Sequence, residues 1–137
     1  MRTTIDLNND WRTVASTIYK KPDDSKIFGQ AEVDVTELEA FVAEKRKNGI
    51  KITLTHIFTL AAARALRFEL PEMNTYVRRG KIVKRPQIDA MVSVLLDGSE
   101  LGSVKIANAD QITLEELSVI MAKEIKNKQP EIIIDRR

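Results

Sequence analysis

One stretch constrains the fold more than any other, residues 51–71, KITLTHIFTLAAARALRFELP. Its apolar side chains recur every three or four residues, which is the spacing of a helix with one buried face. This stripe contains Leu54, Ile57, Phe58, Leu60, Ala61, Ala65 and Phe68. Thr53 or Thr55 can cap the first turn, and Pro71 ends the helix because proline offers no amide. The stretch predicts a long core helix whose alanines allow a sheet to approach closely.

Two substitutions would test whether this helix is buried as expected. If Phe58 and Ala62 are buried, Phe58→Asp or Ala62→Glu unfolds the chain. An uncompensated buried charge costs several kcal/mol, which is a large share of a total stability of roughly 5–15 kcal/mol.

The chain before this helix predicts two shorter helices and a strand. Asp10 is a candidate cap for a helix that runs to Tyr19, with Trp11, Val14, Ala15 and Ile18 on one face. Residues 27–35 alternate between apolar and polar side chains, which predicts a strand with one buried face. Thr36 and Glu39 have the spacing of a capping box. The helix that they begin runs to about Arg46, places Leu38, Phe41 and Val42 inward, and ends at Asn48-Gly49.

The chain after this helix predicts mainly strands. Residues 74–77 and 82–85 form a hairpin around Arg79-Gly80. Residues 88–96 are apolar on nearly both faces, which is typical of a strand in the middle of a sheet. Asp97-Gly98 is a turn signal, and residues 101–107 form the partner strand.

A last helix is predicted between a capping box at its start and a proline after its end. Thr113 and Glu116 form a second capping box, and Pro130 breaks the helix after about Asn127. Its inward residues are Leu117, Ile120, Met121 and Ile125. The tail contains three consecutive isoleucines, which form a short apolar strand. The whole order predicts an α/β layered domain with a mixed or mostly antiparallel sheet and packed helices.

Composition narrows the class of protein. The length of 137 residues predicts one domain, residues 1–137. The net charge of +2 gives no indication of nucleic-acid binding, and the absence of cysteine excludes disulfides. No apolar run is long enough to span a membrane, and no apolar signal core begins the chain. We therefore expect a cytoplasmic protein without a membrane segment.

Four stretches together resemble a known family. They are residues 5–16 (IDLNNDWRTVAS), residues 32–49 (EVDVTELEAFVAEKRKNG), residues 51–94 and residues 112–124 (ITLEELSVIMAKE). The third stretch carries an alanine-rich helix, the corner LPEMN and a hairpin that leads into a strand. These features resemble the first half of the catalytic domain of 2-oxo acid dehydrogenase acyltransferases, the dihydrolipoamide acyltransferase family, and of its relative chloramphenicol acetyltransferase.

The resemblance implies a chloramphenicol acetyltransferase-like fold, usually trimeric, that transfers acyl groups between coenzyme A and an acceptor. In the family a histidine in an HxxxDG motif acts as the base, and a hydroxyl residue further along stabilises the oxyanion. This sequence contains neither motif, and residues 97–110 depart from the family's pattern. We therefore expect a truncated domain without catalytic residues of its own.

Five residues are candidates for substrate binding. Arg12 matches a site-supporting arginine of the family, and Tyr19, Phe28 and Gln30 could line a channel wall. His56 is the only histidine, and it is either an ordinary first-turn residue or a base that lacks an orienting carboxylate. The cluster Arg78–Arg85 either meets coenzyme A phosphates or is a solvated hairpin. No grouping has the ligand spacing of a metal site.

These features leave three functions open. The chain is a non-catalytic assembly or binding subunit, half of an enzyme that a complementary chain completes, or a binder of coenzyme A or a small molecule. Exposed apolar surface, including that near Ile132–Ile134, predicts a homo-oligomer, either a trimer or a dimer. We expect no acyl transfer by these residues alone.

Overall fold

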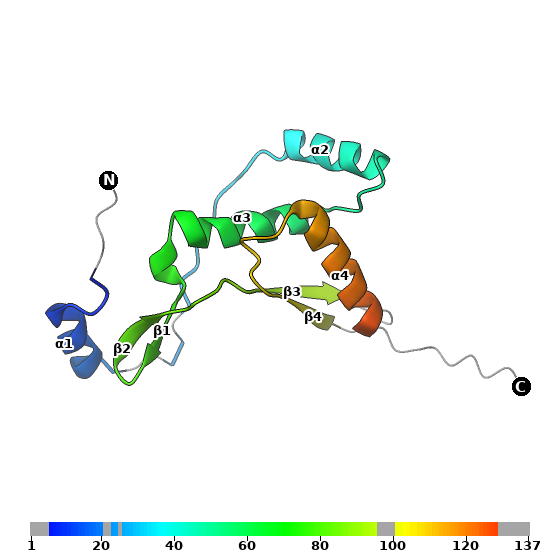
Figure 1. Cartoon of the computed structure of the whole chain (residues 1–137). Helices are drawn as coiled ribbons and strands as arrows, with labels where there is room; N and C mark the ends of the chain where they lie inside the picture. Colours follow the sequence, from blue (N-terminus) through cyan, green and yellow to red (C-terminus); the bar gives the residue numbers. More distant parts are fainter. Residues whose placement is uncertain (1–5, 21–22, 25, 96–100, 129–137) are drawn as a thin grey trace, which may run out of the picture.

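The computed structural model of the chain describes residues 6–20, 23–24, 26–95 and 101–128 (Figure 1). Its elements are α1 (Asp10–Ile18), α2 (Thr36–Lys47), α3 (Leu54–Phe68), the short 3-10 helix η1 (Pro71–Met73), β1 (Thr75–Arg78), β2 (Lys81–Lys84), β3 (Ala90–Leu95), β4 (Leu101–Ile106) and α4 (Leu114–Lys128). Both strand pairs are antiparallel, β1 with β2 and β3 with β4. The expected α/β class is confirmed.

Helix α3 is the central element, as its sequence predicts. It lies between α2 on one side and the β3–β4 pair on the other (Figure 1). Thr53 caps it together with His56, each side chain bonding the backbone amide of the other. Its buried residues are His56, Leu60 and Ala63, so the inward face is rotated from the expected stripe.

Two residues that were expected in the core lie outside it. Phe58 is 50% exposed and Ala62 is exposed. The condition for the two unfolding substitutions is therefore not met, so Phe58→Asp and Ala62→Glu are no longer expected to unfold the chain. The periodicity identified the helix but not its rotation, because apolar residues occur on more than one of its faces.

The core lies between α3, α4 and one face of the β3–β4 sheet. Val92 of β3 pairs in register with Val104 of β4, and both side chains are buried. Leu117 and Met121 of α4 pack in the same cluster. The remaining members are Leu60, Ala63, Ile88, Ile106 and Ala109. The expected strand 101–107 and the last helix are thus confirmed.

The expected position of β3 is wrong. Among the described residues β3 pairs only with β4, so it is an edge strand and not the middle of a sheet. Its burial alternates, with Val92 inside and Met91 and Leu95 exposed by 66% and 72%. The apolar residues on its outer face have no covering element in the part of the chain that the structure describes.

The expected strand at residues 27–35 is also wrong. This segment has no regular structure in the described residues, and it connects α1 to α2. Ile27, Phe28 and Val33 are 97%, 90% and 67% exposed. Alternation indicates a strand only where a partner edge is available, and none of the described strands pairs with this segment.

Helices α1 and α2 begin differently from expectation. Asn9, not Asp10, caps α1 by accepting a hydrogen bond from the Arg12 amide at 2.9 Å. The box between Thr36 and Glu39 does not form, because Asp34 accepts from the amide and hydroxyl of Thr36 at 2.9 and 2.7 Å. These hydrogen bonds hold the pKa of Asp34 below its ordinary value.

The burial expected of these two helices is only partly found. Helix α1 buries none of its residues, and Trp11 and Ile18 are 66% and 71% exposed. Val42 is the one buried residue of α2. That helix ends as expected at Gly49, whose φ of +85° suits a residue without a side chain.

The hairpin β1–β2 is confirmed and stands apart from the β3–β4 sheet, next to α1 (Figure 1). Arg79 and Gly80 form its turn with φ of 50° and 75°. The side chain of Asn8 bonds both backbone groups of Ile82, donating to the carbonyl at 3.0 Å and accepting from the amide at 2.9 Å. The turn expected at residues 97–98 and the tail at 131–137 lie outside the described residues.

Candidate functional site

A small polar cavity of about 300 Å³ lies where the end of α3, the base of the hairpin and the loop after β4 meet. Its charged lining residues are Arg67, Lys84, Arg85 and Asp110. Polar side chains from Asn74, Gln87 and Gln111 complete it, and Leu66, Pro71, Pro86 and Ile88 form the apolar part. Three cations against one carboxylate make this cavity attractive to an anion.

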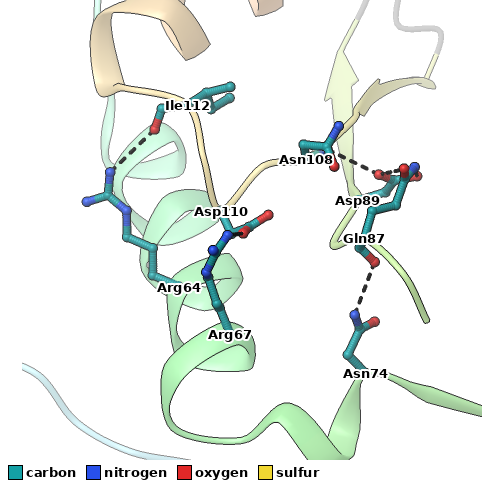
Figure 2. Close-up of polar contacts among 8 residues, drawn as sticks. All are labelled: Arg64, Arg67, Asn74, Gln87, Asp89, Asn108, Asp110 and Ile112. Atoms are coloured by element: carbon teal, nitrogen blue, oxygen red, sulfur yellow. Dashed lines mark hydrogen bonds and ion pairs between the residues drawn. The ribbon is translucent and has the colours of Figure 1, made fainter. Parts of the chain in front are cut away.

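An ion pair forms one wall of this cavity. The Arg67 guanidinium donates to one carboxylate oxygen of Asp110 (Figure 2). The Asp110 side chain is 3% exposed, whereas that of Arg67 is 45% exposed. The other Asp110 oxygen is buried and has no partner among the described residues. A buried carboxylate needs this cation, so the pair fixes the loop after β4 against α3.

A hydrogen-bonded chain begins at the cavity residues Asn74 and Gln87 and continues beyond the cavity (Figure 2). Asn74 donates to the Gln87 carbonyl at 3.1 Å, and the Gln87 side chain donates to Asp89 at 2.9 Å. Asp89 also accepts from the Asn108 amide at 3.2 Å and pairs with Lys105 at 2.9 Å. The Lys105 ammonium and the Gln87 amide lower the pKa of Asp89, which therefore stays ionised at neutral pH.

His56 is occupied by structural contacts. Its Nδ1 accepts from the Thr53 amide at 3.2 Å and lies 2.8 Å from the Thr53 hydroxyl. Burial, and then the charge of Arg46, lower the pKa of His56. Because Nδ1 accepts a backbone hydrogen bond, the imidazole is neutral with its proton on Nε2. The hydroxyl and the imidazole resemble a nucleophile–base pair, but each also bonds the backbone of the first turn.

The other predicted binding residues lie on the exposed N-terminal part. Arg12 is in α1 and Tyr19 directly follows it, with Tyr19 67% exposed. Phe28 and Gln30 are exposed in the segment between α1 and α2. Among the described residues, no hydrogen bond or ion pair joins these four side chains to each other or to His56. Their role in binding stays a prediction.

The lining of the cavity suits the binding of an anion. Among residues 6–20, 23–24, 26–95 and 101–128, no group of three His, Cys, Asp or Glu side chains could hold a metal ion. The polar cavity contains cations and amides but no histidine. It can hold an anion or polar ligand, and its one carboxylate, that of Asp110, is paired with Arg67.

Sequence reasoning did not identify this cavity. Arg67 and Asp110 are 43 residues apart, and no motif links them. The available signal was the position of Asp110, a carboxylate between a predicted strand and a predicted capping box. The Arg78–Arg85 cluster did point to this region, because Lys84 and Arg85 line the cavity.

Solved structures define the class of fold. The chain is similar to the dihydrolipoamide acetyltransferase of Azotobacter vinelandii, a structure concerned with the roles of a serine, a histidine and an asparagine in that enzyme's catalytic mechanism. It is equally similar to the cubic core of the pyruvate dehydrogenase multienzyme complex. Each match has 30% sequence identity and a TM-score of 0.58, and covers 69% of this chain and 40% of the other.

The chain belongs to the 2-oxoacid dehydrogenases acyltransferase (catalytic domain) family, which it matches over residues 6–131. The suspected resemblance is thereby confirmed. No curated protein matches the chain. The chain aligns with less than half the length of the two structural relatives. In the described part of the chain, no helix is long and apolar enough to cross a membrane.

Proposed function

We propose that this chain is a single acyltransferase-family domain, residues 1–137, that serves in assembly or ligand binding and transfers no acyl group by itself. The observation that carries the proposal is the state of its only histidine. His56 is buried, neutral and bonded to the Thr53 backbone amide. Acyl transfer needs a base within reach of the acceptor and donors aimed at the oxyanion, and these residues supply no such set.

The second candidate is half of a coenzyme A-dependent acyltransferase whose site is completed by another chain. The match to 40% of the acetyltransferase chains supports it, because these residues correspond to only part of that fold. In this reading Tyr19, Phe28 and Gln30 form one wall of a substrate channel. Arg12 and His56 are further candidates for substrate binding. Coenzyme A would be bound with its phosphates near cations such as Lys84 and Arg85.

The remaining properties follow the family. We propose a cytoplasmic homo-oligomer, a trimer or a dimer, that binds no nucleic acid. The multimeric core named for one structural relative supports an assembling protein. Cations near the hairpin are offset elsewhere on the chain, whose net charge is only +2.

The test is thiol release from acetyl-coenzyme A with dihydrolipoamide or chloramphenicol as acceptor. We expect the chain to match the uncatalysed rate, since one oxyanion donor alone is worth about 10²–10³ in rate. His56→Ala is assayed in parallel, with circular dichroism to confirm that the variant is folded. Turnover that His56→Ala abolishes in a folded variant would overturn the proposal. Turnover that appears only when a second chain is added would favour the half-enzyme.

A further inference from the structure

One carboxylate oxygen in the polar cavity lacks a hydrogen-bond partner. The Asp110 side chain is 3% exposed, and Arg67 bonds one of its two oxygens. The second oxygen is buried and accepts no hydrogen bond among the described residues. Figure 2 shows it on the side of the carboxylate that is turned away from Arg67. Because a buried acceptor without a donor costs free energy, this oxygen indicates a donor group on a ligand of the cavity.

Two cations of the same cavity have no acidic partner. Both Lys84 and Arg85 line the cavity, and among the described residues neither forms an ion pair. The Arg85 guanidinium lies 5.1 Å from the centre of the Tyr76 ring, a cation–π contact that holds it at the base of the hairpin. Three cations and one carboxylate leave a net charge of +2 on the lining. A dianion matches this charge.

Backbone hydrogen bonds bring these groups together from distant parts of the chain. The Arg85 amide donates to the Asn74 carbonyl at 3.0 Å, which closes the base of the hairpin. The Ala109 amide donates to the Ile88 carbonyl at 2.8 Å, which places Asp110 beside the segment that follows the hairpin. The cavity is therefore built by the fold itself. Its volume of about 300 Å³ is at the lower end of the range for ligand sites, so it suits a small molecule.

We propose that this cavity binds a small dianion that also carries a hydroxyl group. The anionic oxygens lie against Lys84 and Arg85, and the hydroxyl donates to the second oxygen of Asp110. Two kinds of compound share this chemistry, namely hydrogenphosphate with its P–OH group and a hydroxydicarboxylate such as malate. A dianion without a hydroxyl leaves the Asp110 oxygen unpaired, and the site discriminates against it.

The ligand named here rests on the proposed binding role, but the two are tested separately. The proposed function is tested by acyl transfer, whereas the ligand is tested by equilibrium binding. A chain that binds the dianion and also turns over acetyl-coenzyme A would overturn only the proposed function. A chain that does neither would overturn only the dianion site.

The first experiment uses two matched pairs of ligands. Phosphate keeps at least one proton at neutral pH, whereas sulfate of the same shape keeps none, and malate differs from succinate by one hydroxyl. In isothermal titration calorimetry at constant ionic strength, we expect phosphate, malate or both to bind at least about 10-fold more tightly than the matched ligand. A preference found only for phosphate identifies a phosphate group, and one found only for malate identifies a carboxylic acid. Equal affinities within both pairs, or no binding at about 10 mM, would overturn the proposal.

The second experiment compares two lysines of β2. Lys81 and Lys84 are both exposed, but only Lys84 lines the cavity. Lys84→Met should weaken binding of the preferred ligand at least about 10-fold, because it removes a charge that contacts the anion. Lys81→Met should leave the affinity unchanged. Equal effects of the two variants would mean that the general charge of the hairpin attracts the anion, and the proposed site would be wrong.

The third experiment tests the acceptor with Asp110→Asn. The asparagine amide can donate where the carboxylate could only accept. A variant that circular dichroism shows to be folded should therefore lose the preference for the hydroxyl-bearing ligand of each pair. If the folded variant keeps the wild-type preference, Asp110 is not the acceptor and the proposal fails. If the variant does not fold, the comparison of Lys84→Met with Lys81→Met decides.

Discussion

Helices α4 and α1 both carry apolar residues at helical spacing, but the apolar residues of α4 are buried and those of α1 are exposed. Helix α4 buries Leu117 and Met121, which are 0% and 4% exposed. Helix α1 buries no residue, although Trp11 and Ile18 are apolar. The difference is the surface available to each, because α4 lies over the β3–β4 sheet and α1 lies beside a hairpin (Figure 1). An amphipathic pattern is stabilising only where a second surface covers it.

The largest expected difference in stability between the two regions comes from removing one apolar side chain from each. Leu117→Ala should lower the free energy of unfolding by about 2–5 kcal/mol, since it leaves a cavity in a packed core. Ile27→Ala should change it by less than about 0.5 kcal/mol, because Ile27 is 97% exposed. Urea denaturation followed by circular dichroism, at protein concentrations too low for association, measures both. Equal losses would show that the N-terminal region is packed in solution.

A smaller contrast comes from the helix caps. Thr113 accepts from the Glu116 amide at 3.2 Å, and Glu116 accepts from the Thr113 amide at 2.7 Å, which is the expected capping box. Thr113→Ala should lower the free energy of unfolding by about 1 kcal/mol.

The matched variant is Asn9→Ala in α1. It should leave global unfolding unchanged within about 0.5 kcal/mol, because α1 is not packed on the core. Hydrogen exchange should instead show faster exchange confined to α1. Loss of global stability as large as that of Thr113→Ala would mean that α1 belongs to the same cooperative unit as α4.

The smallest effect is a pH dependence at the start of α3. Burial, followed by the charge of Arg46, lowers the pKa of His56 from the ordinary value of 6.5. The unfolded chain therefore binds a proton first, and stability is complete above about pH 6.5 and is lost as the pH falls below it. Between about pH 7 and about pH 6 the loss is at most about 0.7 kcal/mol.

His56→Gln is the control, because glutamine at this position keeps the capping box but does not titrate. Thermal melts of this variant should not change over the same pH interval. A wild-type chain whose stability is also constant there would show that His56 is accessible to water and protonates freely.

Local signals along the chain were strong enough to predict most elements. Caps, turn residues and periodicity placed α3, α4, the hairpin and β4 close to their observed positions. The predictions that failed concern segments whose structure depends on a neighbouring strand. Residues 27–35 have the pattern of a strand and β3 the composition of a central one, but each needs a neighbour that the described residues do not provide. The buried face of α3 was misplaced because Phe58 lines an open groove beside residues 89–92 and is half exposed.

The candidate site was less predictable than the fold. The identification of His56 as a first-turn residue needed only its position after Thr53, and the capping contacts match it. The pairing of Arg67 with Asp110 depends on how the loop after β4 returns to α3. Side chains so distant in sequence meet only through tertiary packing, which no local pattern encodes.

The two bonds between Asn8 and Ile82 have a consequence for solubility. A side-chain amide has the same donor and acceptor as a peptide group, so Asn8 imitates one residue of a neighbouring strand at the β2 edge. An approaching chain must displace it before it can pair there, and the flanking lysines add charge repulsion against basic partners. A single asparagine thus blocks one hydrogen-bonding position at the β2 edge, and its loss would leave both backbone groups of Ile82 open to pairing with another strand.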